Sequence, residues 1–187
     1  MRSAAILAGG QSTRFGGRDK SALLVDGRTI LDLQLAQLSS VTDDVMIIRA
    51  ADDVVPGCGP LGGLHAALTR ARGDAVFVIA CDMPYVTAPL AQYLLSLTAS
   101  GTADIVVPQT ARGYHPLCAV YTRACLDRVS RRLGERRLKM IELVEAMRTR
   151  VVTEEELGRF GDADRLLANV NTPAEYEGLE ALQSHKL

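Results

Sequence analysis

A glycine-rich segment between residues 7 and 20 holds the first residues of the chain that could do chemistry. Gly9 and Gly10 follow a short apolar run, so they lie at the carboxyl end of an expected strand, where open α/β sheets bind ligands. Arg14, Arg18 and Lys20 add positive charge, and exposed amides beside glycines can cradle phosphate. The spacing matches neither a Walker A loop nor a GxGxxG loop. We expect a site for a triphosphate here, and the alternative is a surface loop that is rich in glycine by chance.

A carboxylate stands at the end of the most apolar stretch of the sequence. Residues 75–80 predict a buried strand, and Asp82 follows within the motif Cys-Asp-Met-Pro. Magnesium prefers oxygen ligands and usually takes only one or two carboxylates, so phosphate and water complete its shell. Asp82 is therefore the candidate metal ligand, and the alternative is a helix-capping or turn-forming aspartate before Pro84.

Three further positions could contact a substrate. Residues 59–61, Gly-Pro-Leu, are expected to form a rigid turn into a helix, and an ordinary loop fits that pattern equally well. Asn169 and Asn171 alternate, so both side chains are expected on one side of an extended segment, where two amides could bind a polar heterocycle or a phosphate. The alternative is a turn with a helix cap, which neither asparagine is needed to supply. His115 precedes an expected strand and either faces the cleft or is a loop residue.

Alternating strands and helices must position these groups. Apolar runs predict the strands, and apolar residues at helical spacing predict the helices between them. The expected strands lie at residues 4–8, 45–48, 75–80, 105–107, 118–121 and 151–152, and the expected helices at residues 30–38, 62–72 and 123–147, with a last helix from Pro173. Such alternation predicts an α/β fold with a mostly parallel sheet, right-handed crossovers and helices on both faces.

Size, charge and composition narrow the class of protein. A chain of 187 residues suits one domain. The formal net charge of −1 argues against a nucleic-acid partner, which usually requires a basic domain or stripe. Four cysteines without a CxxC pair argue against zinc and disulfide sites and fit a reducing cytosol. We find neither a bilayer-spanning apolar stretch nor the pattern of a secretory signal, so we expect a cytoplasmic protein without a membrane partner.

Four motifs taken together resemble the molybdenum cofactor guanylyltransferase family. Along the chain they are residues 7–10 with Arg14, Gly16 and Lys20, then residues 59–61, residues 81–84 and residues 169–173. Their order and context agree, and they span nearly the whole chain. The resemblance implies a Rossmann-like nucleotidyltransferase fold and a magnesium-dependent reaction, in which GTP and a molybdopterin-type cofactor give the guanine dinucleotide form and pyrophosphate. Within a single domain we expect a nucleotide-binding half at about residues 1–100 and an acceptor-binding half at about residues 101–187.

The resemblance also implies roles for individual residues. Asp82 would hold magnesium and the nucleotide, and Arg14 and Lys20 would stabilise charge on the departing pyrophosphate. Asp53 matches the family's guanine-side carboxylate in spacing, and a carboxylate can accept hydrogen bonds from both N1–H and the exocyclic amine of guanine. The expected nucleotide-binding residues are Leu7, Ala8, Gly9, Gly10, Lys20, Asp53, Gly59, Pro60, Leu61 and Asp82. The expected acceptor-binding residues are His115, Asn169 and Asn171.

The chain departs from the family pattern before the guanine-side carboxylate. Relatives usually have a longer connection there, whereas here Arg49 to Asp53 follow the second expected strand directly, which leaves Asp52 as an alternative to Asp53. Relatives that transfer CMP to the same pterin more often carry Ala where Gly9 stands and an Asp in the Asn-Val-Asn segment, so both features favour GTP.

Three alternatives for the function stay open at this point. They are a cytidylyltransferase to the same pterin, another sugar- or alcohol-phosphate nucleotidyltransferase, and a non-catalytic nucleotide or cofactor carrier. Besides GTP and the molybdopterin-type cofactor, the expected partners are cofactor-insertion proteins and molybdoenzymes.

Overall fold

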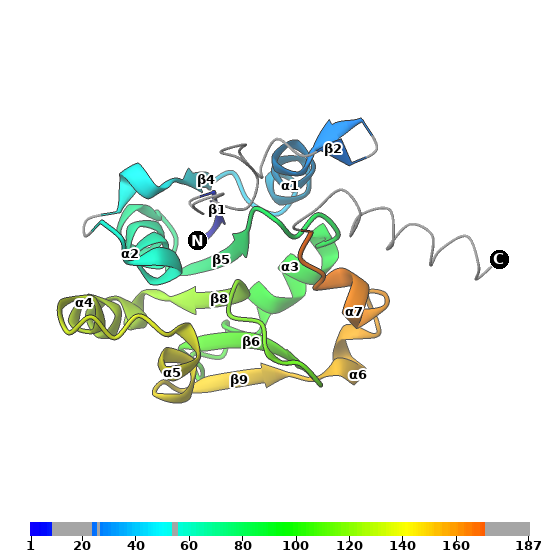
Figure 1. Cartoon of the computed structure of the whole chain (residues 1–187). Helices are drawn as coiled ribbons and strands as arrows, with labels where there is room; N and C mark the ends of the chain where they lie inside the picture. The colour runs from blue at the N-terminus through cyan, green and yellow to red at the C-terminus, as the bar shows by residue number, and fades with distance from the viewer. Residues whose placement is uncertain (9–23, 26, 54–55, 171–187) are drawn as a thin grey trace.

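Strands and helices alternate along the chain in the computed structural model, which describes residues 1–8, 24–25, 27–53 and 56–170 (Figure 1). The strands are β1 (Arg2–Leu7), β2 (Leu24–Val25), β3 (Arg28–Thr29), β4 (Val45–Ile48), β5 (Ala75–Ala80), β6 (Ile105–Thr110), β7 (Gly113–Tyr114), β8 (Cys118–Thr122) and β9 (Thr149–Val152). The α-helices are α1 (Ile30–Ser39), α2 (Gly59–Arg70), α3 (Ala88–Ser96), α4 (Leu126–Gly134), α5 (Met140–Glu145), α6 (Glu154–Leu157) and α7 (Ala163–Leu166). Two short 3₁₀ helices are η3 (Ala50–Asp52) and η4 (Arg123–Cys125).

A seven-stranded sheet follows the order β4-β1-β5-β8-β6-β7, with β9 also paired to β6. β1 is parallel to β4 and β5, and β6 is parallel to β9. β8 is antiparallel to both β5 and β6, because the short connection from β6 can only return the chain antiparallel, whereas a parallel return needs a crossover of about a dozen residues. The expectation of a mostly parallel sheet is confirmed, with β7 and β8 as its antiparallel members.

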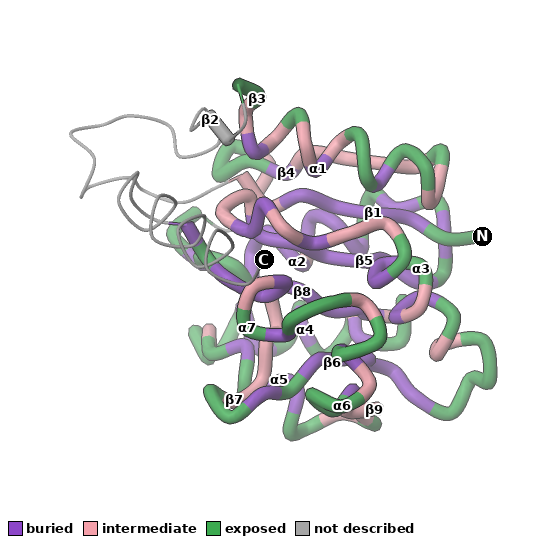
Figure 2. The backbone as a smooth tube through the Cα atoms, turned by 90° about the vertical axis from the view of Figure 1, so that its right-hand side faces the viewer, coloured by how far each residue is buried: buried purple, intermediate pink, exposed green. Residues whose placement is uncertain are grey.

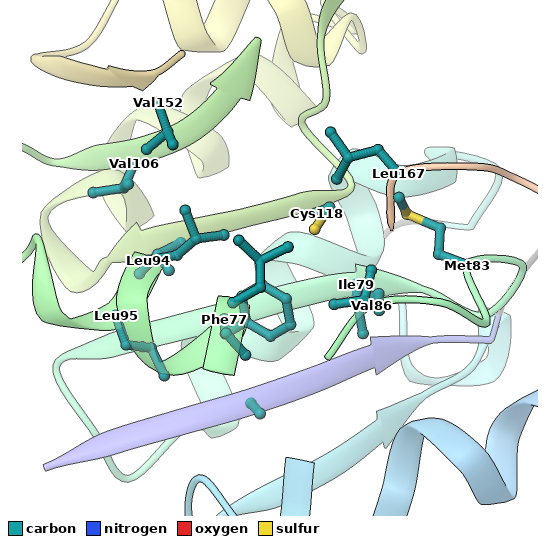
Figure 3. Packing of buried hydrophobic residues seen from close by; sticks show 14 of the residues in the cluster. Phe77, Ile79, Met83, Val86, Leu94, Leu95, Val106, Cys118, Val152 and Leu167 are labelled. Atoms are coloured by element: carbon teal, nitrogen blue, oxygen red, sulfur yellow. The ribbon is translucent and has the colours of Figure 1, made fainter. Parts of the chain in front are cut away.

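Helices cover both faces of the sheet, as expected, and each face has its own apolar core. Successive side chains of a strand point to opposite faces, so Phe77 and Ile79 of β5 lie in one cluster and Val76 and Val78 in the other. Figure 3 shows the first cluster, where Leu94 of α3 packs near Phe77. The second cluster includes side chains of α2, α4 and α5. All of β5 is therefore buried, and Figure 2 shows such buried strands at the centre of the molecule.

The motif at residues 59–61 is the first turn of α2, and not a turn that precedes the helix at residue 62. Pro60 suits this place because the first N–H groups of a helix have no partner within the helix, so the missing N–H of proline costs little there. The sequence pattern concealed this start, since Gly-Pro is equally common in loops.

The expected single helix over residues 123–147 is wrong, because the chain breaks between α4 and α5. After α4, Arg136 adopts the left-handed conformation with φ 57°. The Arg137 N–H then donates to the Arg132 carbonyl at 2.9 Å, and the Arg136 N–H donates to the Leu133 carbonyl at 3.1 Å. These two bonds form a Schellman motif, which ends a helix. Glycine usually occupies the left-handed position, so an arginine there gave no sequence signal for the break.

Within the described ranges, none of the helices combines the length and the apolar content that are needed to cross a membrane. The expected last helix from Pro173 lies outside the described residues.

Candidate active site

A pocket of about 150 Å³ opens where β1, β4 and β5 end. In the paired register, Leu7 at the end of β1 lies between Ile48 of β4 and Ala80 of β5. Because the three strands are parallel, their carboxyl ends meet at one edge of the sheet, where α/β proteins bind ligands. The lining residues are Leu7, Ile48, Arg49, Ala50, Asp53, Gly59, Pro60, Gly63, Ala80, Cys81, Asp82 and Leu117.

Asp82 lies in the turn that directly follows β5, and it is half-buried at the wall of the pocket. The turn closes with a hydrogen bond from the Met83 N–H to the Ala80 carbonyl at 3.3 Å. The Cys81 N–H donates to the Leu7 carbonyl at 3.1 Å, which ties the turn to β1. A half-buried carboxylate on a restrained turn can present its oxygens to a cation or to a phosphate-bound metal.

Asp52 and Asp53 are adjacent in sequence but have different surroundings. The Asp52 carboxylate accepts hydrogen bonds from the Arg49 N–H and from the Arg70 guanidinium, each at 2.7 Å. The bond from the Arg49 N–H is the main reason why the pKa of Asp52 lies below its usual value, and the charge of Arg70 adds to it. Asp52 is thus held in the structure of η3 and does not line the pocket.

The Asp53 carboxylate lines the pocket and packs tightly against α2. A Cβ added at Gly62 would lie only 2.8 Å from Asp53 Oδ2, so the glycine makes room for the carboxylate. Burial, followed by the negative charge of Asp52, raises the pKa of Asp53 above its usual value. Among the described residues, no hydrogen bond to the Asp53 carboxylate is formed. A partly desolvated carboxylate of this kind can accept hydrogen bonds from a ligand.

The first turn of α2 forms another wall of the pocket through Gly59 and Pro60. No side chain caps the helix at Cys58, and its first turn carries no acidic residue. The first backbone N–H groups of a helix favour anions, so this wall suits a negatively charged ligand. Leu61 is fully buried and packs in the apolar core, so its side chain does not reach the pocket.

The residues expected on the acceptor side are not all near the pocket. Asn169 is exposed and precedes Val170, whose N–H donates to the Asp82 carbonyl at 2.7 Å. His115 does not line the pocket, although Leu117 does. The Nε2 atom of His115 lies 3.0 Å from the Thr110 hydroxyl. Burial is the main cause that lowers the pKa of His115, so the imidazole is neutral at pH 7.

The remaining expected site residues are Ala8 and five residues outside the described ranges. Ala8 directly follows β1, and its N–H donates to the Ile48 carbonyl at 2.8 Å. Gly9, Gly10, Arg14, Lys20 and Asn171 lie outside the described residues.

Arg49, which was not among the expected site residues, lines the pocket together with Asp53 and Asp82. A charged residue directly after an apolar strand was the available signal, because that position faces the ligand edge of the sheet.

The donor set of the pocket fits magnesium in part. Within the described ranges, no group of three or more His, Cys, Asp and Glu side chains could enclose a metal ion. Magnesium is usually bound through one or two carboxylates together with substrate phosphates and waters, so Asp82 fits a metal that arrives with a nucleotide.

Comparison with known proteins shows the family. Residues 4–151 match the MobA-like NTP transferase domain. The molybdenum cofactor guanylyltransferase of Desulfosudis oleivorans is 36% identical over 192 residues, which cover 94% of this chain and 93% of that protein.

Two solved structures share the fold. The molybdopterin-guanine dinucleotide biosynthesis protein A of Archaeoglobus fulgidus superposes with a TM-score of 0.78 at 24% identity, covering 99% of this chain and 100% of that one. The manganese complex of Rv0371C from Mycobacterium tuberculosis superposes with a TM-score of 0.62 at 20% identity, covering 81% of this chain and 87% of that one. The chain is a nucleotidyltransferase that belongs to the MobA-like NTP transferase family.

Proposed function

We propose that the protein transfers GMP from GTP to the phosphate of a molybdopterin-type cofactor and releases pyrophosphate. The relative of known function at 36% identity, matched over nearly its whole length, supports this reaction. The observation that carries the proposal is the pair of carboxylates, Asp53 and Asp82, that line one pocket at the ligand edge of the sheet.

Asp53 is the base-reading residue of this proposal. A carboxylate has only acceptors, and guanine offers two donors side by side, N1–H and the exocyclic amine. Cytosine and adenine each place a ring-nitrogen acceptor beside their amine, which would repel the carboxylate. Asp52 is the weaker candidate because Arg49 and Arg70 already occupy its oxygens.

Asp82 is the metal ligand of this proposal. Magnesium held by Asp82 together with phosphate and water oxygens would neutralise charge on the nucleotide during transfer. The manganese complex of a protein with the same fold is consistent with a divalent metal in the reaction. Arg14 and Lys20 would stabilise the charge that develops on pyrophosphate, and phosphoryl transfer of this kind needs no covalent nucleophile.

Asn169 and Asn171 would contact the acceptor. The bond from Val170 to the Asp82 carbonyl supports this assignment for Asn169, because it brings the asparagine segment to the metal-binding turn. His115 would contact only a more distant part of the acceptor, since it does not line the nucleotide pocket. A cytoplasmic location and transfer of the product to insertion proteins or molybdoenzymes complete the proposal.

Pyrophosphate release tests the reaction directly. Purified protein would be incubated with Mg²⁺, a molybdopterin-type acceptor, and GTP or CTP in separate samples. We expect release with GTP, and loss of release when the acceptor is omitted. Release with CTP alone would refute the role of Asp53, and GTP binding without any release would favour a carrier of nucleotide or cofactor.

A further inference from the structure

Gln34 is a buried polar residue on α1 that lies against the turn carrying Asp82. Only 2% of its surface is exposed. Its side-chain Nε2 donates to the Ala80 carbonyl at 2.8 Å and to the Met83 carbonyl at 3.0 Å. These carbonyls belong to the first and last residues of the turn, so one amide group contacts both ends of it.

The chemistry of the amide matches this geometry. A carboxamide NH₂ carries two hydrogens, which can serve two carbonyl oxygens at once. The Ala80 carbonyl also accepts the hydrogen bond that closes the turn from the Met83 N–H. Gln34 therefore fixes the distance between the ends of the turn, and the residues between those ends are Cys81 and Asp82.

The packing of α1 alone does not explain a glutamine at this position. The other buried side chains of α1, Ile30 and Leu38, are apolar, and a buried polar group is unfavourable unless it forms hydrogen bonds. Among the described residues, the Gln34 Oε1 atom is buried and accepts no hydrogen bond. An apolar side chain of similar size would fill the space without this cost, but it would leave the Met83 carbonyl without its donor.

Two further hydrogen bonds hold the turn. Cys81 bonds to Leu7 on β1, and Val170 bonds to the Asp82 carbonyl from the segment that leads to Asn169. Both of those bonds are donated by backbone N–H groups, whereas the bonds from Gln34 are donated by a side chain. A substitution at Gln34 therefore removes two restraints on the turn without changing the residues of the turn itself.

We propose that Gln34 is a positioning residue that orients Asp82 toward a nucleotide-bound divalent metal. The inference rests on the proposed role of Asp82 in metal binding. Residues that orient a metal ligand typically change metal affinity about 10- to 100-fold when they are replaced.

The test compares Gln34→Met with a matched variant, Gln37→Met. Methionine is unbranched and similar in length, so it keeps the packing and removes both donors. Gln37 lies on the same helix, is exposed, and accepts a hydrogen bond from the Ala88 N–H at 2.8 Å, away from the turn. Binding of Mn²⁺, as a paramagnetic substitute for Mg²⁺, would be measured by electron paramagnetic resonance in the presence of GTP.

We expect Gln34→Met to weaken Mn²⁺ binding about 10-fold or more, and Gln37→Met to leave it unchanged. GTP binding in EDTA should be the same in both variants and in the wild type, because the nucleotide pocket itself is intact. Hydrogen exchange at Met83 should become faster in Gln34→Met only. In an Asp82→Asn background, Gln34→Met should have no further effect on Mn²⁺ binding.

The outcomes separate this inference from the proposed function. Wild-type protein that binds GTP but no Mn²⁺ would refute the metal role of Asp82, and the role of Gln34 with it. Equal Mn²⁺ binding by wild type and Gln34→Met would refute the positioning role alone. A Gln34→Met protein that does not fold would show that the side chain is structural. Gln34→Glu keeps the shape of the side chain but repels both carbonyls. In that case Gln34→Glu would have to fold and lose Mn²⁺ binding to restore the inference.

Discussion

Replacing Gly62 by alanine tests whether the Asp53 carboxylate contacts the base. Gly62 lies in α2, and a Cβ built there would be 2.8 Å from Asp53 Oδ2 and 2.9 Å from Asp53 Cγ. Ordinary van der Waals contact begins at 3.4 Å, so the carboxylate is 0.6 Å too close and must move. The variant therefore displaces Asp53 without removing its charge.

The variant is expected to weaken GTP binding much more than it changes stability. Alanine in place of glycine stabilises a helix by about 0.5–1 kcal/mol, which offsets part of the strain. Hydrogen bonds to a charged group contribute about 1.5–3 kcal/mol, and each 1.4 kcal/mol is about a tenfold change in affinity. Loss of a single bond from Asp53 to guanine should therefore weaken GTP binding by about 10- to 100-fold, with a nearly unchanged melting temperature.

Isothermal titration with GTP and thermal unfolding would be measured for Gly62→Ala and for Gly134→Ala. Gly134 is the last residue of α4, and a Cβ added there meets no atom within 4 Å, so this control changes the same residue type without a clash. A folded Gly62→Ala protein with wild-type GTP affinity would refute the role of Asp53. A large loss of stability would instead refute the premise that the carboxylate, and not the backbone, gives way.

Two further substitutions test the site, and a third tests the ion pair between Arg150 and Glu156. Asp82→Asn should raise the Mg²⁺ concentration for half-maximal turnover, and an unchanged Mg²⁺ titration would contradict the metal assignment. Arg49→Ala should weaken GTP binding by about tenfold if its charge meets the nucleotide, and titration calorimetry that shows no change would limit Arg49 to its backbone role. A hydrogen bond from the Arg150 side chain, followed by one from the Thr153 N–H, lowers the pKa of Glu156 to about 2. The ionised Glu156 carboxylate therefore stabilises the fold above pH 4.5, and this stabilisation is lost as the pH falls toward 2. Urea unfolding should show this pH dependence in the wild type and not in Glu156→Gln.

The sequence predicted those parts of the fold that depend on hydrophobic periodicity. The strand at residues 75–80 was predicted with its observed bounds, because six apolar residues in succession fit only a fully buried element. The prediction of one helix over residues 123–147 was wrong. The break in it depends on an arginine in the left-handed conformation, which hydrophobic periodicity does not indicate. The start of α2 was missed because Gly59 and Pro60 favour a loop as much as a helix.

Part of the expected nucleotide-binding set lines the pocket, including Gly59 and Pro60 of α2. Leu7, Asp53 and Asp82 were nominated and are brought together in one pocket. Gln34 was not nominated, because its two carbonyl partners lie 46 and 49 residues away along the chain. Such a contact arises from the packing of α1 on the sheet, and no local pattern indicates it. His115 was nominated from its place before a strand, but the turn of the chain there brings Leu117 to the pocket instead.

The short connection after β4 determines which of two adjacent carboxylates is available to a ligand. In η3 the Asp52 oxygens bond to the Arg49 N–H and to Arg70, so this residue closes the 3₁₀ turn. Because one carboxylate is used for the turn, the next residue emerges against α2, where Gly62 leaves room for it. The tandem Asp52-Asp53 therefore has a structural explanation: the first aspartate restrains the 3₁₀ turn, and the second is left to face the pocket.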